Sequence, residues 1–168
     1  MQNKKGKSPI QKTKPGEYPL VVTAEERLTS NEYQFNGEAV CIPLVSSTGH
    51  GHASIKRIHY QKGKFALGNI LGALTSLDEN LVMTKYLYLY LSYHKDSLLV
   101  PLMKGTTNVS LNMRDIQNVI VSIPNIDTQM KVIERIGKIK HLEDKIAEAK
   151  LQMEEFKKSY YTMIFDGI

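Results

Sequence analysis

The end of the chain is the feature that most constrains its fold. From Asp127 to Ile164 the sequence has an uninterrupted helical pattern, and Gly137 is the only glycine in that stretch. Apolar residues recur there at alternating intervals of three and four, which is typical of a helix that packs along its length against another helix. At about 1.5 Å per residue the helix would be roughly 55 Å long, more than a domain built from the preceding residues could cover. The pattern therefore predicts a globular domain in residues 1–126 and a long dimerisation helix in residues 127–168.

We expect this helix to pair two copies of the chain in antiparallel orientation. Ala149 is small whereas Phe156 and Tyr160 are bulky, and these sizes fit the repeated layers of a parallel dimer poorly. In an antiparallel pair, a small residue of one helix can face a large residue of the other. The alternative is a helix that packs on its own domain. The predicted seam consists of Ile139, Leu142, Ile146, Ala149, Met153, Phe156, Tyr160 and Met163.

Composition favours a single globular domain with an anionic partner. The chain has 168 residues, of which 42% are hydrophobic, enough for a core. Its net charge of +5 and pI near 9.2 make nucleic acid the first candidate partner. The single cysteine, Cys41, excludes an internal disulfide and a cysteine-based zinc site, and its apolar neighbours predict a buried thiol. Without an apolar run of transmembrane length or a hydrophobic signal core, we expect a cytoplasmic protein and no membrane partner.

The region before the long helix is predicted to be α+β, with a mixed or antiparallel sheet. Strands are expected at residues 18–23, 39–45, 54–60, 64–67 and 119–123, and helices at 82–95 and 112–118. The strands at 54–60 and 64–67 would form a hairpin whose tight turn places Gly63 at positive φ. Residues 68–72 are glycine-rich and lead into a loop at 75–80. Asp127 is expected to cap the long helix.

The lysine-rich beginning of the chain has two interpretations. Residues 1–16 hold five lysines and no acidic residue. They form either a solvated, partly disordered arm or a segment that contacts phosphate groups.

Two polar clusters are candidates for DNA contact. The first directly follows an apolar strand, so it should form a loop at the edge of the sheet. Hydroxyls and amides can bond base edges, arginine can bond guanine, and lysine can contact phosphates. The residues predicted to contact DNA are Ser46, Ser47, Thr48, His50, His52, Ser54, Lys56 and Arg57 in the first cluster and Lys104, Thr106, Thr107 and Asn108 in the second.

Other chemistry has less support in the sequence. His50, His52 and His59 lack an adjacent carboxylate or thiolate, so we expect no metal site there. The first cluster could also be a solvated loop in which the glycines only make turns. There is no phosphate-binding loop that ends in Lys-Ser/Thr, no Gly-x-Ser-x-Gly elbow and no Asn-Pro-Pro-aromatic run. The sequence is not that of an enzyme by itself, and we expect no resident cofactor.

Three segments of the chain together resemble a known family. The segments 37–61, 63–71 and 118–129 resemble the target recognition domain of type I restriction-modification specificity subunits. The same domain occurs at the C-terminus of some fused N6-adenine methyltransferases. The last segment combines a short apolar run, Pro124 and Gln129, which matches the family's signature at the start of the long helix.

The resemblance implies a function in restriction and modification. A full specificity subunit of this family has two recognition domains, each of which reads half of a bipartite DNA site, and two antiparallel helices that dock methyltransferase subunits. This chain has one domain and one helix, so we expect a half-subunit that homodimerises on double-stranded DNA. Its partners would be a methyltransferase subunit, which binds S-adenosylmethionine, and possibly a restriction subunit.

Two alternatives to the half-subunit stay open. The chain could be a coiled-coil module that bridges proteins without DNA specificity. It could also be the excised recognition domain of a fused methyltransferase-nuclease, whose helix would pack within its own chain.

Overall fold

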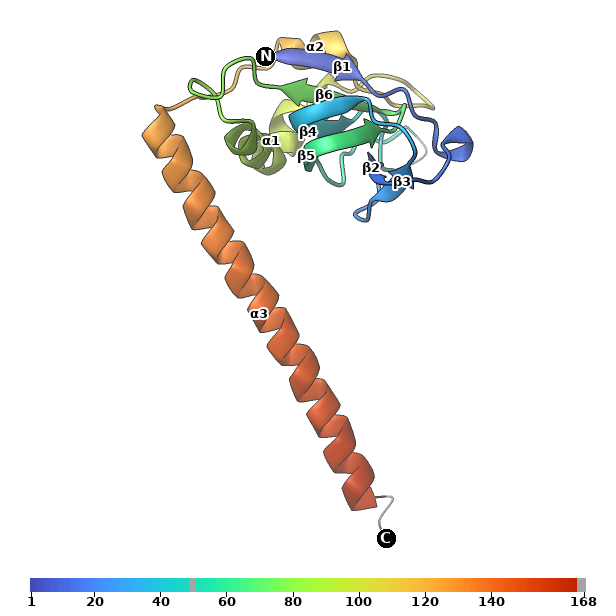
Figure 1. Ribbon diagram of the computed structural model, residues 1–168, viewed down its shortest axis with the longest axis vertical. Coiled ribbons are helices and arrows are strands. Elements are labelled where there is room, and N and C mark those ends of the chain that lie inside the picture. Colours follow the sequence, from blue (N-terminus) through green and yellow to red (C-terminus); the bar gives the residue numbers. More distant parts are fainter. Residues whose placement is uncertain (49–50, 166–168) are drawn as a thin grey trace. The chain divides into compact units, whose positions relative to one another are not determined.

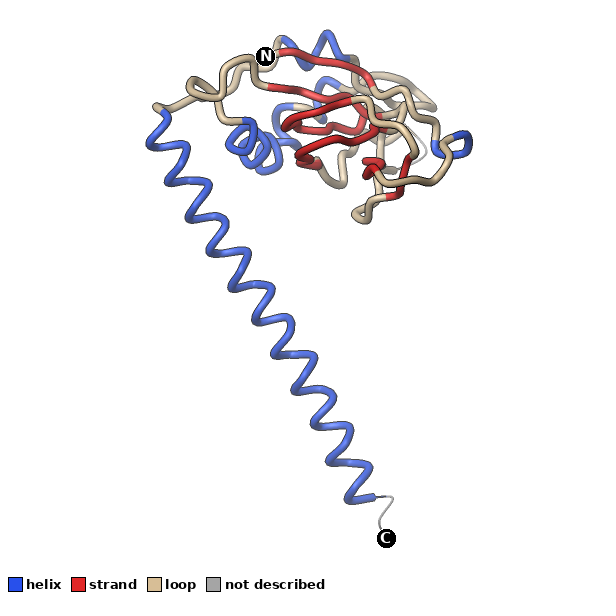
Figure 2. Tube along the Cα trace, in the orientation of Figure 1, coloured by secondary structure: helices blue, strands red, loops and turns tan. Residues whose placement is uncertain are grey.

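The computed structural model describes residues 1–48 and 51–165. Contacts between residues divide the chain into two compact units, Met1–Gln129 and Met130–Ile168. The first unit holds a six-stranded sheet, and the described residues of the second belong to one helix (Figures 1 and 2). The fold is therefore α+β, as the sequence predicted. None of the helices among the described residues is long and apolar enough to span a membrane.

The sheet consists of six strands: β1 Gln2–Lys5, β2 Tyr18–Val21, β3 Leu28–Ser30, β4 Phe35–Pro43, β5 His59–Leu67 and β6 Leu71–Thr75. Their order in the sheet is β1-β6-β4-β5-β2-β3. All neighbouring strands are antiparallel except β2 and β5, which run parallel, so the sheet is mixed.

Both faces of the central strands are buried. In β4, Val40 and Ile42 belong to one apolar cluster whereas Ala39 and Cys41 belong to another, because successive side chains of a strand point to opposite faces. The helix α1, Thr84–Leu98, contributes Leu87 and Leu91 to the first cluster. Cys41 is fully buried, as predicted, and burial raises the pKa of its thiol to about 12.

The predicted hairpin at residues 54–67 is wrong. Residues 54–58 are not in a strand, and β5 continues through Gln61–Gly63 in register with β4. Gly63 does have a positive φ of 86°, but it lies opposite Gly37, whose φ is 136°. Only glycine adopts such angles readily, so facing glycines let both strands bend at one point without ending their pairing. The glycine that signals a turn in the sequence is therefore part of a strand.

The predicted strand at residues 119–123 is also wrong. Residues 118–125 form neither helix nor strand, and Ile120 is 88% exposed. The edge of the sheet beside β6 is occupied instead by β1, from the lysine-rich beginning of the chain. That beginning is ordered: it continues through a 3-10 turn at Ile10–Lys12, and the backbone N–H of Gly6 donates to Leu71.

The short helices follow the prediction closely. The helix expected at 82–95 is α1, and the one expected at 112–118 is α2, Met113–Gln117. Asn112 caps α2, since its side chain accepts a hydrogen bond from the backbone N–H of Arg114 at 3.0 Å. A second 3-10 turn, Val100–Leu102, follows α1.

The long helix α3 extends from Ile126 to Phe165 (Figure 2). Its cap differs from the prediction. The side-chain oxygen of Asn125, not Asp127, accepts from the backbone N–H of Thr128 at 2.9 Å. Within the second unit no described residue is buried. The large apolar side chains of the predicted seam are therefore exposed in the single chain, and their pairing remains a prediction.

Candidate nucleic-acid interface

The two polar clusters that the sequence singled out lie side by side. Just beyond β4, Val45 forms an antiparallel bridge with Ser110, and the backbone N–H of Ser46 donates to Val109 at 2.9 Å. Ser110 also pairs with Lys104, which closes the second cluster into a tight loop. Loop 46–57 and loop 104–108 therefore both begin at the same paired backbone segments, although about fifty residues separate the loops in the sequence.

Gly51 brings the two loops into contact. Its φ is 78°, and a Cβ atom at this position would collide with the carbonyl oxygen of Thr106. A glycine is required here both for the backbone angle and for the close approach. The predicted contact residue His50 and its neighbour Gly49 lie outside the described residues.

The hydroxyl groups of loop 46–57 mainly hold the loop together. The Ser46 hydroxyl donates to the carbonyl of His52 and accepts from the backbone N–H of Ser54 at 3.1 Å. The Ser47 hydroxyl accepts from the backbone N–H of Lys56 at 2.7 Å. These bonds satisfy polar backbone groups that a loop would otherwise leave to water. The Thr48 hydroxyl likewise bonds the carbonyl of His52, and the Ser54 hydroxyl bonds the Thr48 hydroxyl at 3.2 Å.

A different set of side chains is free to meet a ligand. Within the described residues, the ammonium of Lys56, the ring of His52 and the side chain of Asn108 make no hydrogen bond or ion pair, and all three residues are exposed. The side chains of Thr106 and Thr107 are likewise exposed and unbonded there. A lysine, an imidazole, an amide and two hydroxyls are groups that contact phosphates and base edges.

Two of the predicted cations are already paired within the domain. Arg57 forms an ion pair with Glu25 at 2.8 Å, and Lys104 forms one with Asp115 at 3.3 Å. Each pair joins one partly buried and one exposed side chain, and ion pairs at the protein surface contribute little stability, so an incoming phosphate could replace the carboxylate. These two residues differ from Lys56, whose ammonium makes no such pair among the described residues.

Buried apolar residues anchor both loops in the core. Ile55 lies in loop 46–57 and Ile58 directly follows it. Both are buried in the cluster that also contains Leu91 of α1. Val109 and Leu111 anchor the second loop in the same cluster. The exposed side chains of both loops therefore extend from backbone that these buried residues fix to the core.

A buried histidine and an arginine lie where loop 46–57 enters β5. The Arg27 guanidinium lies 3.2 Å from Nδ1 of His59 and donates to the Gln61 side chain at 3.0 Å. Burial, together with the charge of Arg27, lowers the pKa of His59 to about 4, so the ring is neutral near pH 7. His59 is thus a structural side chain. Among the described residues no three His, Cys, Asp or Glu side chains come together as a metal site.

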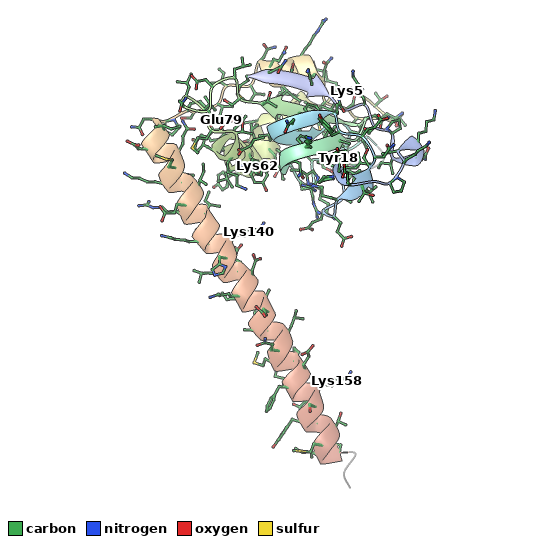
Figure 3. The ribbon with its side chains drawn as sticks, in the orientation of Figure 1. Lys5, Tyr18, Lys62, Glu79, Lys140 and Lys158 are labelled. Carbon is green, nitrogen blue, oxygen red and sulfur yellow. The ribbon has the colours of Figure 1, made fainter. Side chains whose placement is uncertain are left out.

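The sequence did not identify Arg27 as part of this region. It reaches the end of loop 46–57 from the segment between β2 and β3, and no local motif marks that contact. Lys5 of β1 belongs to the lysine-rich segment for which the sequence left phosphate contact open (Figure 3). Together with Val45, Ser110 and Asn112 it lines a cleft of about 330 Å³. Lys5 therefore lies beside the paired segments at Val45 and Ser110, from which the two loops begin.

Comparisons with known proteins agree with this architecture. A family model described as "Type I restriction modification DNA specificity domain" matches residues 1–153. Among solved structures, the type I restriction-modification system S subunit from M. genitalium matches with a TM-score of 0.64 and 16% sequence identity. The match covers 98% of this chain and 43% of that subunit, so the chain spans less than half its length. Comparison with curated proteins gave no significant match.

Proposed function

Because the chain belongs to the family of type I restriction modification DNA specificity domains, we propose that it reads a DNA sequence for a restriction-modification system. Loops 46–57 and 104–108 would contact the major groove. Lys56 would bind a phosphate, whereas Asn108 would bond a base edge, for which adenine is the geometric match of an amide. The observation that carries the proposal is that the two loops are joined by backbone bonds and present unbonded polar side chains together.

The functional particle would be a homodimer. The chain has one globular unit and one long helix and corresponds to 43% of the S subunit that it resembles, so two copies would supply two reading domains. The exposed apolar seam of α3 supports pairing, because each large side chain that it buries contributes about 1.5–3 kcal/mol. A two-fold dimer predicts two identical half-sites in inverted orientation, separated by a fixed spacer.

Methylation of adenine would be carried out by a partner. We assign to this chain the choice of site, and to a methyltransferase subunit that binds S-adenosylmethionine the transfer of the methyl group. A restriction subunit could join the same assembly. The residues of loops 46–57 and 104–108 supply hydrogen bonds and charge, which suits recognition.

The proposal is tested by selecting bound duplexes from a random-sequence library, with the full chain and its methyltransferase subunit. We expect an enriched inverted repeat and an affinity that falls steeply with salt. Bound duplexes without any shared sequence would contradict the proposal. Affinity that does not depend on salt would instead favour a module that only bridges proteins.

Light scattering on the chain alone tests the dimer separately. A mass of two chains at micromolar concentration is expected. A monomer would instead favour a recognition domain whose helix packs within its own chain, as in a fused methyltransferase.

A further inference from the structure

Two neighbouring lysines of β1 lie on opposite faces of the sheet. Lys4 pairs with Ala73 of β6, and Lys5 pairs with Gly72. Successive side chains of a strand point to opposite faces, and each lysine lines a different cleft. Both lysines are exposed. They therefore share a strand and a charge but differ in what surrounds them.

No carboxylate is found among the described residues that line the cleft beside Lys5. We name it the stem cleft, and its lining residues are Lys5, Leu44, Val45, Ile70, Ser110, Leu111, Asn112 and Met113. By contrast, Glu38 and Glu79 line the cleft beside Lys4. A cation whose cleft lacks acidic groups attracts anions, whereas carboxylates in the same cleft offset that attraction. Of the two clefts, the stem cleft is therefore the one that favours an anion.

Three hydrogen-bond donors of the stem cleft are unused. Within residues 1–48 and 51–165, the ammonium of Lys5, the hydroxyl of Ser110 and the side-chain NH2 of Asn112 make no hydrogen bond or ion pair. All three residues are exposed. Asn112 uses its side-chain oxygen to cap α2, which leaves the NH2 group free to donate. A cation, a hydroxyl and an amide N–H are groups with which proteins hold DNA phosphates.

The walls of the stem cleft are held in place. The side chain of Asn3, also in β1, donates to the carbonyl of Met113 at 3.2 Å and accepts from the Gln117 side chain at 3.0 Å. Gly72 lies opposite Lys5, and a Cβ atom there would collide with the sulfur of Met113. The glycine therefore lets α2 pack closely on the sheet beside Lys5.

The stem cleft adjoins both DNA-reading loops. Val45 and Ser110, which form a bridge at the base of loop 46–57, line the cleft. Ser110 also pairs with Lys104, at the start of loop 104–108. The cleft and the two loops therefore form one continuous surface of the first unit.

We propose that the stem cleft binds a backbone phosphate of the duplex that loops 46–57 and 104–108 contact. Lys5 neutralises the phosphate, while Ser110 and Asn112 donate hydrogen bonds to its oxygens. This inference rests on the proposed function and adds a contact that positions the domain on DNA without selecting a sequence.

Salt titrations of the full chain test the contact. Lys5→Ala should lower the affinity for duplex DNA about fivefold near about 0.1 M salt, because one phosphate is no longer neutralised. The slope of the logarithm of the binding constant against the logarithm of the salt concentration should become shallower by about 0.9. Lys5→Arg should keep the wild-type slope, since it keeps the charge. Lys4→Ala is the matched control and should keep the wild-type affinity and slope.

Sequence dependence adds a second criterion. The loss in Lys5→Ala should be equal for a duplex selected from the random-sequence library and for a scrambled duplex, since a phosphate carries no sequence information. Equal slopes for Lys5→Ala and Lys4→Ala, or a loss confined to the selected duplex, would overturn the inference.

Ser110→Ala separates the hydrogen bond from the charge. It should lower the affinity about threefold but leave the salt slope unchanged, because the hydroxyl is neutral. An unchanged affinity would remove Ser110 from the contact.

Chemical footprinting locates the contact without any substitution. Bound DNA should protect Lys5 of the full chain from an amine-acylating reagent, while Lys4 stays reactive, as read by tandem mass spectrometry. Equal reactivity of Lys5 with and without DNA would overturn the inference.

The outcomes separate this inference from the proposed function. A wild-type chain that selects a sequence, but whose Lys5→Ala and Lys4→Ala variants behave alike, would overturn the stem cleft alone. A wild-type chain that binds no DNA in the presence of its methyltransferase subunit would overturn both.

Discussion

The side chain of Gln129 donates a hydrogen bond to the carbonyl oxygen of Leu81, 48 residues earlier in the chain, at 3.0 Å. It also accepts from the backbone N–H of Met83 at 2.9 Å and donates to Pro124 at 2.8 Å. The residue has 0% of its surface exposed. One amide therefore satisfies three backbone groups from the loop before α1 and the segment before α3, and it holds the first turn of α3 in the first unit.

Gln129→Met should destabilise the first unit by about 3 kcal/mol, because it leaves three partly buried backbone groups without a partner. Urea denaturation of the full chain measures the change. Gln117→Met is the matched control, since Gln117 makes only an exposed bond to Asn3 and its loss should cost less than about 1 kcal/mol. Equal effects of the two substitutions would contradict the structural role of Gln129.

Lys56→Ala should weaken DNA binding for every sequence, because it removes one phosphate contact. The slope of the logarithm of the binding constant against the logarithm of the salt concentration should become shallower by about one. Asn108→Ala should instead reduce discrimination between sequences, by about 1–3 kcal/mol at one base pair. Binding isotherms at several salt concentrations separate the two effects. Lys95→Ala on α1 should leave both properties unchanged, because Lys95 lies outside the two loops. A larger effect of Lys95→Ala than of Lys56→Ala would argue for another binding surface.

Gly51→Ala should disturb the contact between the loops, because it strains the backbone and collides with the carbonyl of Thr106. We expect a loss of about 1–2 kcal/mol in stability and weaker DNA binding in the same variant. The control is Gly137→Ala in α3, where a Cβ meets nothing within 4 Å. That substitution should stabilise the helix by up to about 1 kcal/mol. DNA binding by Gly51→Ala at the wild-type level would show that the loops act independently.

The buried imidazole of His59 should make stability depend on pH. Its pKa in the folded chain is about 4, below the ordinary value near 6.5, so the unfolded chain binds more protons between these two values. Stability from this group is fully present above about pH 6.5 and is lost as the pH falls towards 4. At pH 5 the loss should be about 2 kcal/mol.

Urea midpoints at pH 5 and pH 7 test this dependence. In the His59→Gln chain, the urea midpoint should differ less between pH 5 and pH 7 than it does in the wild-type chain. His141→Gln on α3 should not alter the difference, because His141 is exposed. A His59→Gln chain with an unchanged difference would assign the acid sensitivity to other groups.

Ile146→Asp should convert the proposed dimer to a monomer, because it places a charge in the centre of the antiparallel seam. Leu151→Asp is the matched control: Leu151 is exposed on the same helix but lies outside the seam. Light scattering at equal concentrations distinguishes the two. A monomer from both variants, or from neither, would contradict the predicted seam.

Elements with local signals could be predicted from the sequence. The helix α3 follows from its apolar periodicity and α1 from a long segment rich in leucine and tyrosine, while the cap at Asn112 lies next to α2. The sheet was harder to predict because its pairing is non-local. The strand β1 pairs with β6 about seventy residues away, and Gly63 signals a turn although Gly37 lies opposite it in a strand. No local pattern encodes either partner.

In the candidate site too, local features could be predicted from the sequence whereas tertiary contacts could not. The polar clusters could be recognised from their composition, but their meeting depends on the bridge between Val45 and Ser110, which is tertiary. The roles of the serines also depend on geometry. The sequence suggested that Ser46 and Ser47 would bond bases, whereas in the structure their hydroxyls bond backbone groups of their own loop. Their contact with DNA remains a prediction.

The internal bonding of loop 46–57 has a consequence for how this protein can change. The groups that give the loop its shape, Ser46 and Ser47 among them, are not the groups that it displays, such as His52 and Lys56. Exchanging the displayed residues leaves the supporting bonds intact. If loop 46–57 reads DNA as proposed, a few substitutions among the displayed residues would change the preferred target while the loop keeps its conformation.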